Sequence, residues 1–140
     1  MKVSADRIAD LAARHGEKPG ALLPLLHAIQ DEMGHIPPSA AGIIAKALNL
    51  SSAEVRGVIS FYHHFRTEPS SSPRVEICCA ESCQSMGSEA LLAHARKTCE
   101  VHPVYCLGLC AVSPAMMVDG KPHARVTPEK FDSVMKKAAS

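Results

Sequence analysis

Four of the six cysteines lie in two closely spaced pairs, Cys78-x4-Cys83 and Cys106-x3-Cys110. Thiolates are soft ligands, and a set of four suits either a structural zinc ion or an iron–sulfur cluster. Structural zinc sites are commonly built from cysteine pairs with a few residues between the ligands, so both spacings are compatible with zinc. The pattern therefore predicts a four-thiolate metal centre, and the spacing leaves the choice of metal open.

Three other kinds of cysteine site do not fit the sequence. A thioredoxin-type redox site needs C-x-x-C, a Rieske centre needs histidines in place of two cysteines, and a plant-type ferredoxin needs C-x4-C-x2-C. None of these patterns occurs in the chain. A zinc-stabilised interaction module without a redox role therefore remains the alternative to an iron–sulfur protein.

Two cysteines lie outside the pairs. Cys79 continues the strand face of Val75 and Ile77, which favours burial as a small apolar residue over ligation. A register in which Cys79 replaces Cys78 would give a second C-x3-C pair and is kept as an alternative. Cys99 follows the end of a predicted helix, and we expect it to be structural.

Size and composition limit the classes of function. The chain has 140 residues, 46% of them hydrophobic, and a net charge of +1, which fits one globular domain or two small ones. The charge balance gives no basic stripe for nucleic acid, and no apolar run is long enough for membrane insertion. The N-terminal segment contains Asp6 and Asp10 and does not resemble a secretory signal. A chain with this many apolar helices does not need disulfides, so we expect reduced thiolates and a cytoplasmic location.

The first half of the sequence predicts a small helical bundle over residues 1–68. Apolar residues recur at helical spacing in four short segments. The first is expected to end at His15-Gly16, and the third and fourth contain apolar residues as far as Ala47 and Phe61. Gly34 is expected to end the second helix, and Pro37-Pro38 to begin the third. Ser51-x-x-Glu54 is a capping box that predicts the start of the fourth helix. The segment 67–73, T-E-P-S-S-S-P, reads as a linker.

The second half, residues 74–140, predicts a mixed sheet with helices. Strands are expected at 75–77 and 101–105, helices at 88–97 and from Thr127-Pro128 onward, and a hairpin of strands 115–118 and 123–126 that turns at Asp119-Gly120. The order β-α-β-β-β-α is typical of a small thioredoxin-like sheet. In that fold Pro114, which precedes a strand, is a candidate cis proline.

Each cysteine pair follows a predicted strand. Loops at one end of adjacent strands converge, so the two pairs are expected to surround one compact centre. Both loops are rich in small residues, which let backbone N–H groups approach the sulfurs and offset the negative charge of a cluster. These small residues are Ala80, Ser82, Ser85, Gly87, Gly108, Ala111 and Ser113.

With these motifs the chain closely resembles the thioredoxin-like 2Fe–2S ferredoxin subunits of respiratory complex I, of NAD-reducing hydrogenases and of NAD-dependent molybdenum formate dehydrogenases. The resemblance covers nearly the whole chain. It includes G-H-I-P-P at 34–38, V-R-G-V-I-S-F-Y-H-H-F at 55–65, and C-L-G-x-C at 106–110. It implies one 2Fe–2S cluster, with Cys78, Cys83, Cys106 and Cys110 as its ligands.

The resemblance also implies a role and partners. The role is that of a non-catalytic electron carrier in a dehydrogenase complex, paired with a flavin subunit that exchanges hydride with NAD. C-Q-S-M-G at 83–87 looks most like the gamma subunit of formate dehydrogenase, which implies further iron–sulfur and molybdenum subunits, with complex I and hydrogenase as alternatives. One departure from the family is that only 22 residues separate Cys83 from Cys106, which puts the local fold between them in doubt.

Overall fold

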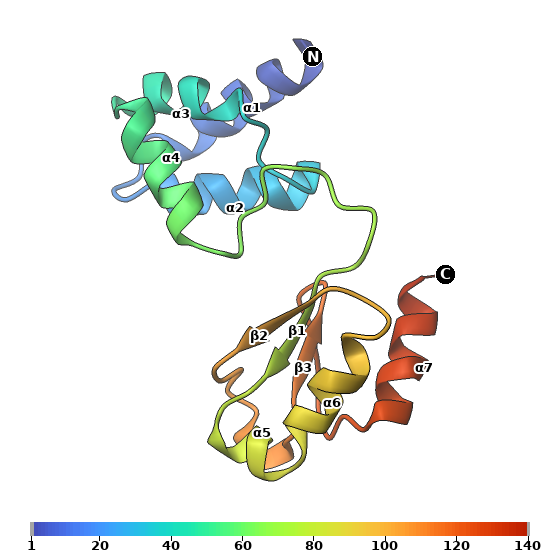
Figure 1. The fold of residues 1–140 in the computed structure, drawn as a ribbon. Coiled ribbons are helices and arrows are strands. Elements are labelled where there is room, and N and C mark those ends of the chain that lie inside the picture. Colours follow the sequence, from blue (N-terminus) through green and yellow to red (C-terminus); the bar gives the residue numbers. More distant parts are fainter. Residues whose placement is uncertain (1, 140) are drawn as a thin grey trace. The chain divides into compact units, whose positions relative to one another are not determined.

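The computed structural model describes the backbone of residues 2–139 and the side chains of residues 5–139. It divides into two compact units, Met1–Ser70 and Ser71–Ser140, and each is considered by itself (Figure 1). In the part of the chain that is described, no helix is both long enough and apolar enough to cross a membrane.

The first unit is a bundle of four short helices (Figure 1). They are α1 (Lys2–His15), α2 (Leu22–Met33), α3 (Ala40–Leu48) and α4 (Ser52–Phe61). Each helix contributes an apolar face to one core, in which Ile8, Leu25, Ile29, Ile44 and Val55 are fully buried. The four helices predicted from apolar periodicity are therefore present.

Local sequence explains where these helices start and stop. Gly34 adopts a left-handed φ of 77° and ends α2, as predicted. The capping box before α4 is complete: the Ser51 hydroxyl accepts the Glu54 N–H, and the Glu54 carboxylate accepts the Ser51 N–H. The third helix begins at Ala40 and not at the prolines, because the Pro37 carbonyl first accepts the Ala40 N–H in a separate turn.

One buried amide connects the segment after α4 to α2. Gln30 is 8% exposed, and its side chain donates to the His64 carbonyl at 2.8 Å and accepts the Arg66 N–H at 2.7 Å. Both polar ends of the amide are thus satisfied, as a buried amide requires. This connection holds Phe65 in the core, whereas Phe61 is 74% exposed and Tyr62 42% exposed.

The second unit is a four-stranded sheet with helices (Figure 1). The sheet order is β2-β1-β3-β4; β1 runs parallel to β2 and antiparallel to β3. Its elements are β1 (Val75–Cys78), α5 (Glu81–Ser85), α6 (Ser88–Ala95), β2 (Val101–Val104), the 3₁₀ turn η1 (Cys110–Val112), β3 (Met116–Val118), β4 (Lys121–His123) and α7 (Pro128–Ala138).

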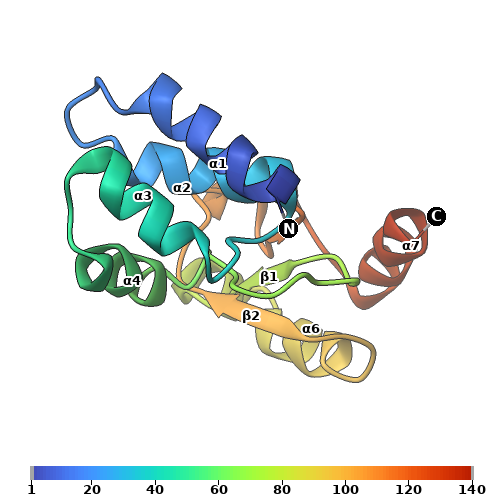
Figure 2. The same cartoon turned by 90° about the horizontal axis from the view of Figure 1, so that it is seen from above.

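Helices α6 and α7 lie on the same side of β1 and β2 (Figure 2). They bury Leu91 and Phe131 against Val75 and Ile77 of the central strand. Pro103 lies in β2, which is an edge strand, and an edge position tolerates the missing N–H of proline. The predicted mixed fold with a thioredoxin-like domain is confirmed. Pro114 is cis.

Two predictions for this unit need correction. The hairpin turns at Asp119-Gly120, with φ of 47° and 76°, and Val118 pairs directly with Lys121. The returning strand is therefore 121–123 and not 123–126, because a two-residue turn leaves no room for a longer loop. The short helix α5 was not predicted, since five residues contain no complete apolar period. The last helix begins as predicted, with Thr127 accepting the Lys130 N–H.

Candidate metal centre

The four paired cysteines come from two loops at one end of the sheet. Cys78 is the last residue of β1 and Cys83 lies in α5, while Cys106 follows β2 and Cys110 begins η1. Because β1 and β2 are parallel neighbours, the loops after them start at the same edge. Cys78 and Cys83 pack with Ala115 in a small apolar cluster that includes Val104 of β2 and residues of both loops, namely Ala80, Leu107 and Leu109.

The second pair is spaced as two ligands of one metal ion would be. The sulfurs of Cys106 and Cys110 lie 3.7 Å apart, and both residues are exposed. Tetrahedral metal–thiolate bonds of about 2.3 Å place two sulfurs about 3.8 Å apart. Little movement is therefore needed for this pair to hold one metal ion.

The first pair is buried and surrounded by hydrogen-bond donors. Cys78 and Cys83 are each 2% exposed. Burial by itself raises the pKa of Cys78, but hydrogen bonds from the backbone of Ala80, from the Cys83 side chain, and from the backbone of Cys106 and Leu107 together lower it. These donors come from both loops, and they favour the thiolate form that binds metal.

The pKa of Cys110 is shifted in the opposite direction, to a higher value. A hydrogen bond with Cys106 raises the pKa of Cys110, and repulsion from the charge of Cys106 adds to this, with smaller contributions from burial and Cys83. Thiolates crowded in this way repel one another until a cation lies between them. The arrangement therefore fits a bound metal centre better than it fits free thiolates.

The backbone of the second loop is shaped around the Cys106 sulfur. Cys106 has a φ of 101° and Gly108 a φ of 74°, both in the left-handed region. The Gly108 N–H donates to the Cys106 sulfur at 3.3 Å. Left-handed residues turn successive N–H groups toward one side, which creates a concave site for an anion. A cysteine in this conformation is also strained, as is common at functional sites.

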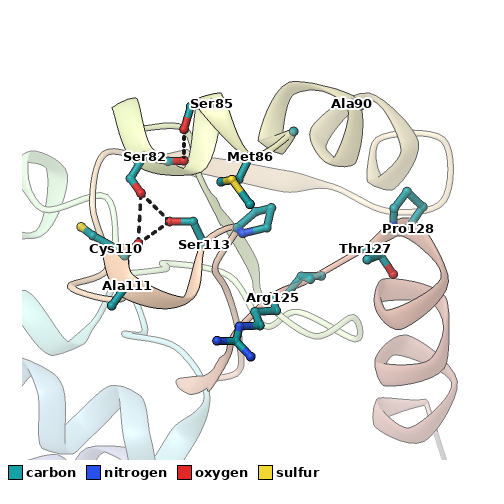
Figure 3. Close-up of a pocket in the computed structure, with 13 residues that line it drawn as sticks. Ser82, Ser85, Met86, Ala90, Cys110, Ala111, Ser113, Arg125, Thr127 and Pro128 are labelled. Atoms are coloured by element: carbon teal, nitrogen blue, oxygen red, sulfur yellow. Dashed lines mark hydrogen bonds between the residues drawn. The ribbon is translucent and has the colours of Figure 1, made fainter.

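Two serines, expected from the sequence only as small residues, connect the cysteine loops. The hydroxyls of Ser82 and Ser113 are 2.7 Å apart, and either can donate to the Cys110 carbonyl, which lies 3.0 Å from Ser82 Oγ and 2.8 Å from Ser113 Oγ (Figure 3). Ser113 Oγ also lies 3.7 Å from the Cys83 sulfur. No local spacing could reveal this contact, because it depends on how the two loops meet.

A cavity of about 760 Å³ opens beside this serine pair (Figure 3). Its walls come from α5, from η1 and from the segment before α7, and they include Met86, Cys110 and Arg125. Met86 is 62% exposed. The Cys110 side of the centre can thus be approached from outside the unit.

The two remaining cysteines are placed differently. Cys79 is half-buried, and its sulfur lies 3.6 Å from the Ile77 carbonyl; burial raises its pKa. Cys99 packs against the core of the second unit, 3.6 Å from the Ala95 carbonyl. The apolar cluster around Cys78 and Cys83 includes neither of them. The contact between Cys78 and Cys83 favours the register in which Cys78, and not Cys79, belongs to the first pair.

Among the side chains of residues 5–139, no group of three or more His, Cys, Asp or Glu is placed to hold a metal ion. A two-iron cluster needs only two thiolates at each iron, and two pairs in adjacent loops fit that demand.

Comparison with known proteins gives a consistent result. The family model described as thioredoxin-like [2Fe-2S] ferredoxin matches residues 8–139. A component of the NADH-quinone oxidoreductase of Rhizobium meliloti is 29% identical, over 93% of this chain and 85% of that protein. The corresponding component of the Aquifex aeolicus oxidoreductase is 32% identical, over 74% of this chain and 72% of that protein. A component of the NADP-reducing hydrogenase of Solidesulfovibrio fructosivorans is 26% identical, over 85% of this chain and 77% of that protein.

A solved structure shares the fold. The NAD⁺-reducing [NiFe]-hydrogenase in its air-oxidised state matches with a TM-score of 0.65 and 22% identity. The match covers 81% of this chain, which spans only 22% of the hydrogenase chain. At this identity the likeness concerns the fold alone.

Proposed function

The chain belongs to the thioredoxin-like [2Fe-2S] ferredoxin family, whose cofactor is one [2Fe-2S] cluster, and we propose that it carries electrons within an NAD(P)-linked dehydrogenase or hydrogenase complex. Such a cluster accepts and returns one electron at a time, and the protein sets its potential. The polypeptide therefore acts as an electron carrier and not as the catalyst of hydride transfer.

We propose Cys78, Cys83, Cys106 and Cys110 as the four ligands. The observation that carries this assignment is the meeting of two cysteine pairs in adjacent loops, with the Cys106 and Cys110 sulfurs 3.7 Å apart. Backbone N–H groups near Cys78 and the Gly108 N–H at Cys106 would offset the charge of the thiolates. The buried first pair would be shielded from water, whereas the second pair lies toward the surface.

The partner is proposed to be a flavin subunit that binds NAD(H). The chain contains no G-x-G-x-x-G or other phosphate-cradling motif, so nicotinamide binding has to be supplied elsewhere. The related proteins are named as subunits of NADH-quinone oxidoreductases and of an NADP-reducing hydrogenase, which supports a role in a larger complex.

Within this class we propose a formate dehydrogenase complex, with molybdenum and further iron–sulfur subunits. The support is the C-Q-S-M-G segment at 83–87. The relatives described above belong to the complex I and hydrogenase types, which stay as alternatives. Identification of the subunits that copurify with the chain distinguishes the three complexes. A molybdopterin subunit would indicate formate dehydrogenase, quinone-module subunits complex I, and a nickel subunit hydrogenase.

The helical bundle, residues 1–68, is proposed to contact the partner. Phe61 and Tyr62 are exposed beside a cavity of about 550 Å³ whose walls include Leu22, Leu50 and Val58. Exposed aromatic residues next to an apolar depression are typical of a protein interface.

Cysteine variants of the full chain test the ligand assignment. Cys83→Ser and Cys106→Ser should each abolish or strongly alter the visible absorption and the EPR signal of the dithionite-reduced cluster. Cys79→Ser and Cys99→Ser are matched controls and should keep both. Stoichiometric zinc without iron in anaerobically prepared protein would contradict the proposal and favour the zinc module.

A further inference from the structure

The Ser82–Ser113 pair lies beside the buried Cys83 sulfur, and the electron-carrier role proposed above does not account for it. Ser113 is 7% exposed, and its Oγ lies 2.7 Å from Ser82 Oγ, 2.8 Å from the Cys110 carbonyl and 3.7 Å from the Cys83 sulfur. Ser82 Oγ lies 3.0 Å from the same carbonyl. Both hydroxyls point toward Cys110 in Figure 3.

When Cys83 is a thiol, its single proton can go either to the Cys78 sulfur or to Ser113 Oγ. In the pattern that includes Ser113, the Cys83 S–H donates to Ser113 Oγ, and the Ser113 hydroxyl donates its own proton to the Cys110 carbonyl. The Ser82 hydroxyl donates to the same carbonyl or to Ser113. A hydroxyl has one proton to donate and two lone pairs to accept with, so every group in this pattern is satisfied.

Metal binding changes the donor and acceptor roles. A metal-bound Cys83 has lost its proton and can only accept, so the contact with Ser113 persists as a hydrogen bond only if Ser113 becomes the donor. The Cys110 carbonyl can then accept its hydrogen bond from the Ser82 hydroxyl, which lies 3.0 Å away. The Ser113 hydroxyl no longer has to donate to that carbonyl and can donate to the Cys83 sulfur.

We infer that the Ser113 hydroxyl donates a hydrogen bond to the metal-bound sulfur of Cys83, and that Ser82 is the positioning residue that frees and orients it. The inference rests on the proposed ligand set, in which Cys83 is a ligand. Because the two serines come from different loops, the same pair also fastens α5 to η1.

This hydrogen bond acts on the reduction potential. A hydrogen bond to a charged sulfur stabilises the more negative, reduced cluster more than the oxidised one, and so raises the potential. The effect is largest where water is excluded, and both Cys83 and Ser113 are buried. The serine proton stays on its oxygen throughout, so no proton transfer accompanies the electron.

The test compares three serine variants of the full chain after cluster loading. Ser113→Ala should shift the midpoint potential to a more negative value without removing the cluster. Ser82→Ala should give a smaller shift in the same direction, because the Cys110 carbonyl then competes for the Ser113 proton. Ser85→Ala is the matched control: its hydroxyl donates to the Ser82 carbonyl at 2.8 Å and should leave the potential unchanged.

A second readout does not depend on the potential. Exchange into D₂O should shift an Fe–S(Cys) stretching band in the resonance Raman spectrum, and part of this shift should be lost in Ser113→Ala. Ser113→Thr keeps a hydroxyl and should restore both the potential and the isotope shift. A purely structural role for Ser113 would not predict the loss of the isotope shift in Ser113→Ala.

The outcomes separate this inference from the ligand assignment. If Ser113→Ala has the potential and isotope shift of the wild type while Cys83→Ser loses the cluster, the inference is wrong and the ligand set stands. If Cys83→Ser keeps a wild-type cluster, the ligand set fails, and the inference with it. Should Ser113→Ala not take up a cluster, Ser82→Ala decides, and a wild-type potential in that variant contradicts the inference.

Discussion

The backbone conformation at position 108, beside the proposed metal centre, favours glycine. Its φ of 74° lies in the left-handed region, and its N–H donates to the Cys106 sulfur at 3.3 Å. A Cβ added at Gly108 would meet no atom within 4 Å, so space does not exclude a larger residue. The need for glycine is therefore conformational, and it concerns the direction of one N–H group.

We predict that Gly108→Ala lowers the free energy of unfolding by about 1–2 kcal/mol, the cost of a left-handed alanine. It should also weaken cluster retention, because relaxation of this strain moves the N–H donor. Gly42→Ala is the control, since Gly42 lies on the exposed side of α3 with free space around it and should stabilise by about 0.5–1 kcal/mol. Denaturant unfolding measures the stability of each variant, and iron content measures cluster retention. Equal changes in the free energy of unfolding for Gly108→Ala and Gly42→Ala would contradict the argument.

At the scale of single residues, the sequence predicts which residues could be ligands better than it predicts which side chains contact one another. The two cysteine pairs and their placement after strands follow from spacing and pattern alone. The Ser82–Ser113 contact does not, because it depends on how two loops 28 to 31 residues apart in sequence meet. Long-range hydrogen bonds of this kind leave no local signature.

Element boundaries follow local rules where a cap or a tight turn sets them. The capping box of α4 and the Thr127 cap of α7 are at the predicted residues. The start of α3 and the returning hairpin strand were misplaced by about two residues, a common error at element ends. The helix α5 was missed because its sequence holds the cysteine loop and not an apolar stripe.

The α4 capping box predicts a pH-dependent stability. The pKa of Glu54 is below its usual value of 4.5, mainly because its carboxylate accepts the Ser51 N–H, and also because of the Ser51 hydroxyl. The stabilisation is therefore present above about pH 4.5 and is lost as the pH falls through the lower pKa of the folded state.

We predict that Ser51→Ala lowers the free energy of unfolding by about 1 kcal/mol at neutral pH. The difference from the wild type should shrink on acidification below pH 4.5, as Glu54 is protonated. Ser52→Ala, one residue later in the first turn, is the control and should have little effect. Unfolding curves at several pH values measure this. Because Ser51→Ala keeps the backbone N–H that binds the carboxylate, a difference independent of pH would show that the contact between the Ser51 hydroxyl and the Glu54 carboxylate does not contribute.

At the scale of the whole molecule, the exposed aromatics of the bundle bear on the partner contact. Phe61 is 74% exposed, so its replacement should hardly change stability. We predict that Phe61→Ser reduces copurification of the flavin subunit several-fold while the cluster spectrum is unchanged. Lys46→Ser, at an exposed position of α3, is the control. Unchanged copurification of Phe61→Ser would remove this surface from the proposed interface.

The two compact units have separate cores, and this determines how cluster loss should spread. The core of the first unit contains only residues up to Phe65, while the cysteine cluster packs with Ala115 and other residues of the second unit. Removing the metal releases the crowded thiolates of the second unit, whereas the first contains no cysteine.

We predict that metal removal accelerates amide hydrogen exchange in 79–87 and 105–113 and leaves α2 and α4 nearly unchanged. Hydrogen-exchange mass spectrometry of the loaded and metal-free forms checks this. Equal acceleration in both units would mean that the bundle draws its stability from the cluster, contrary to the separation of the cores.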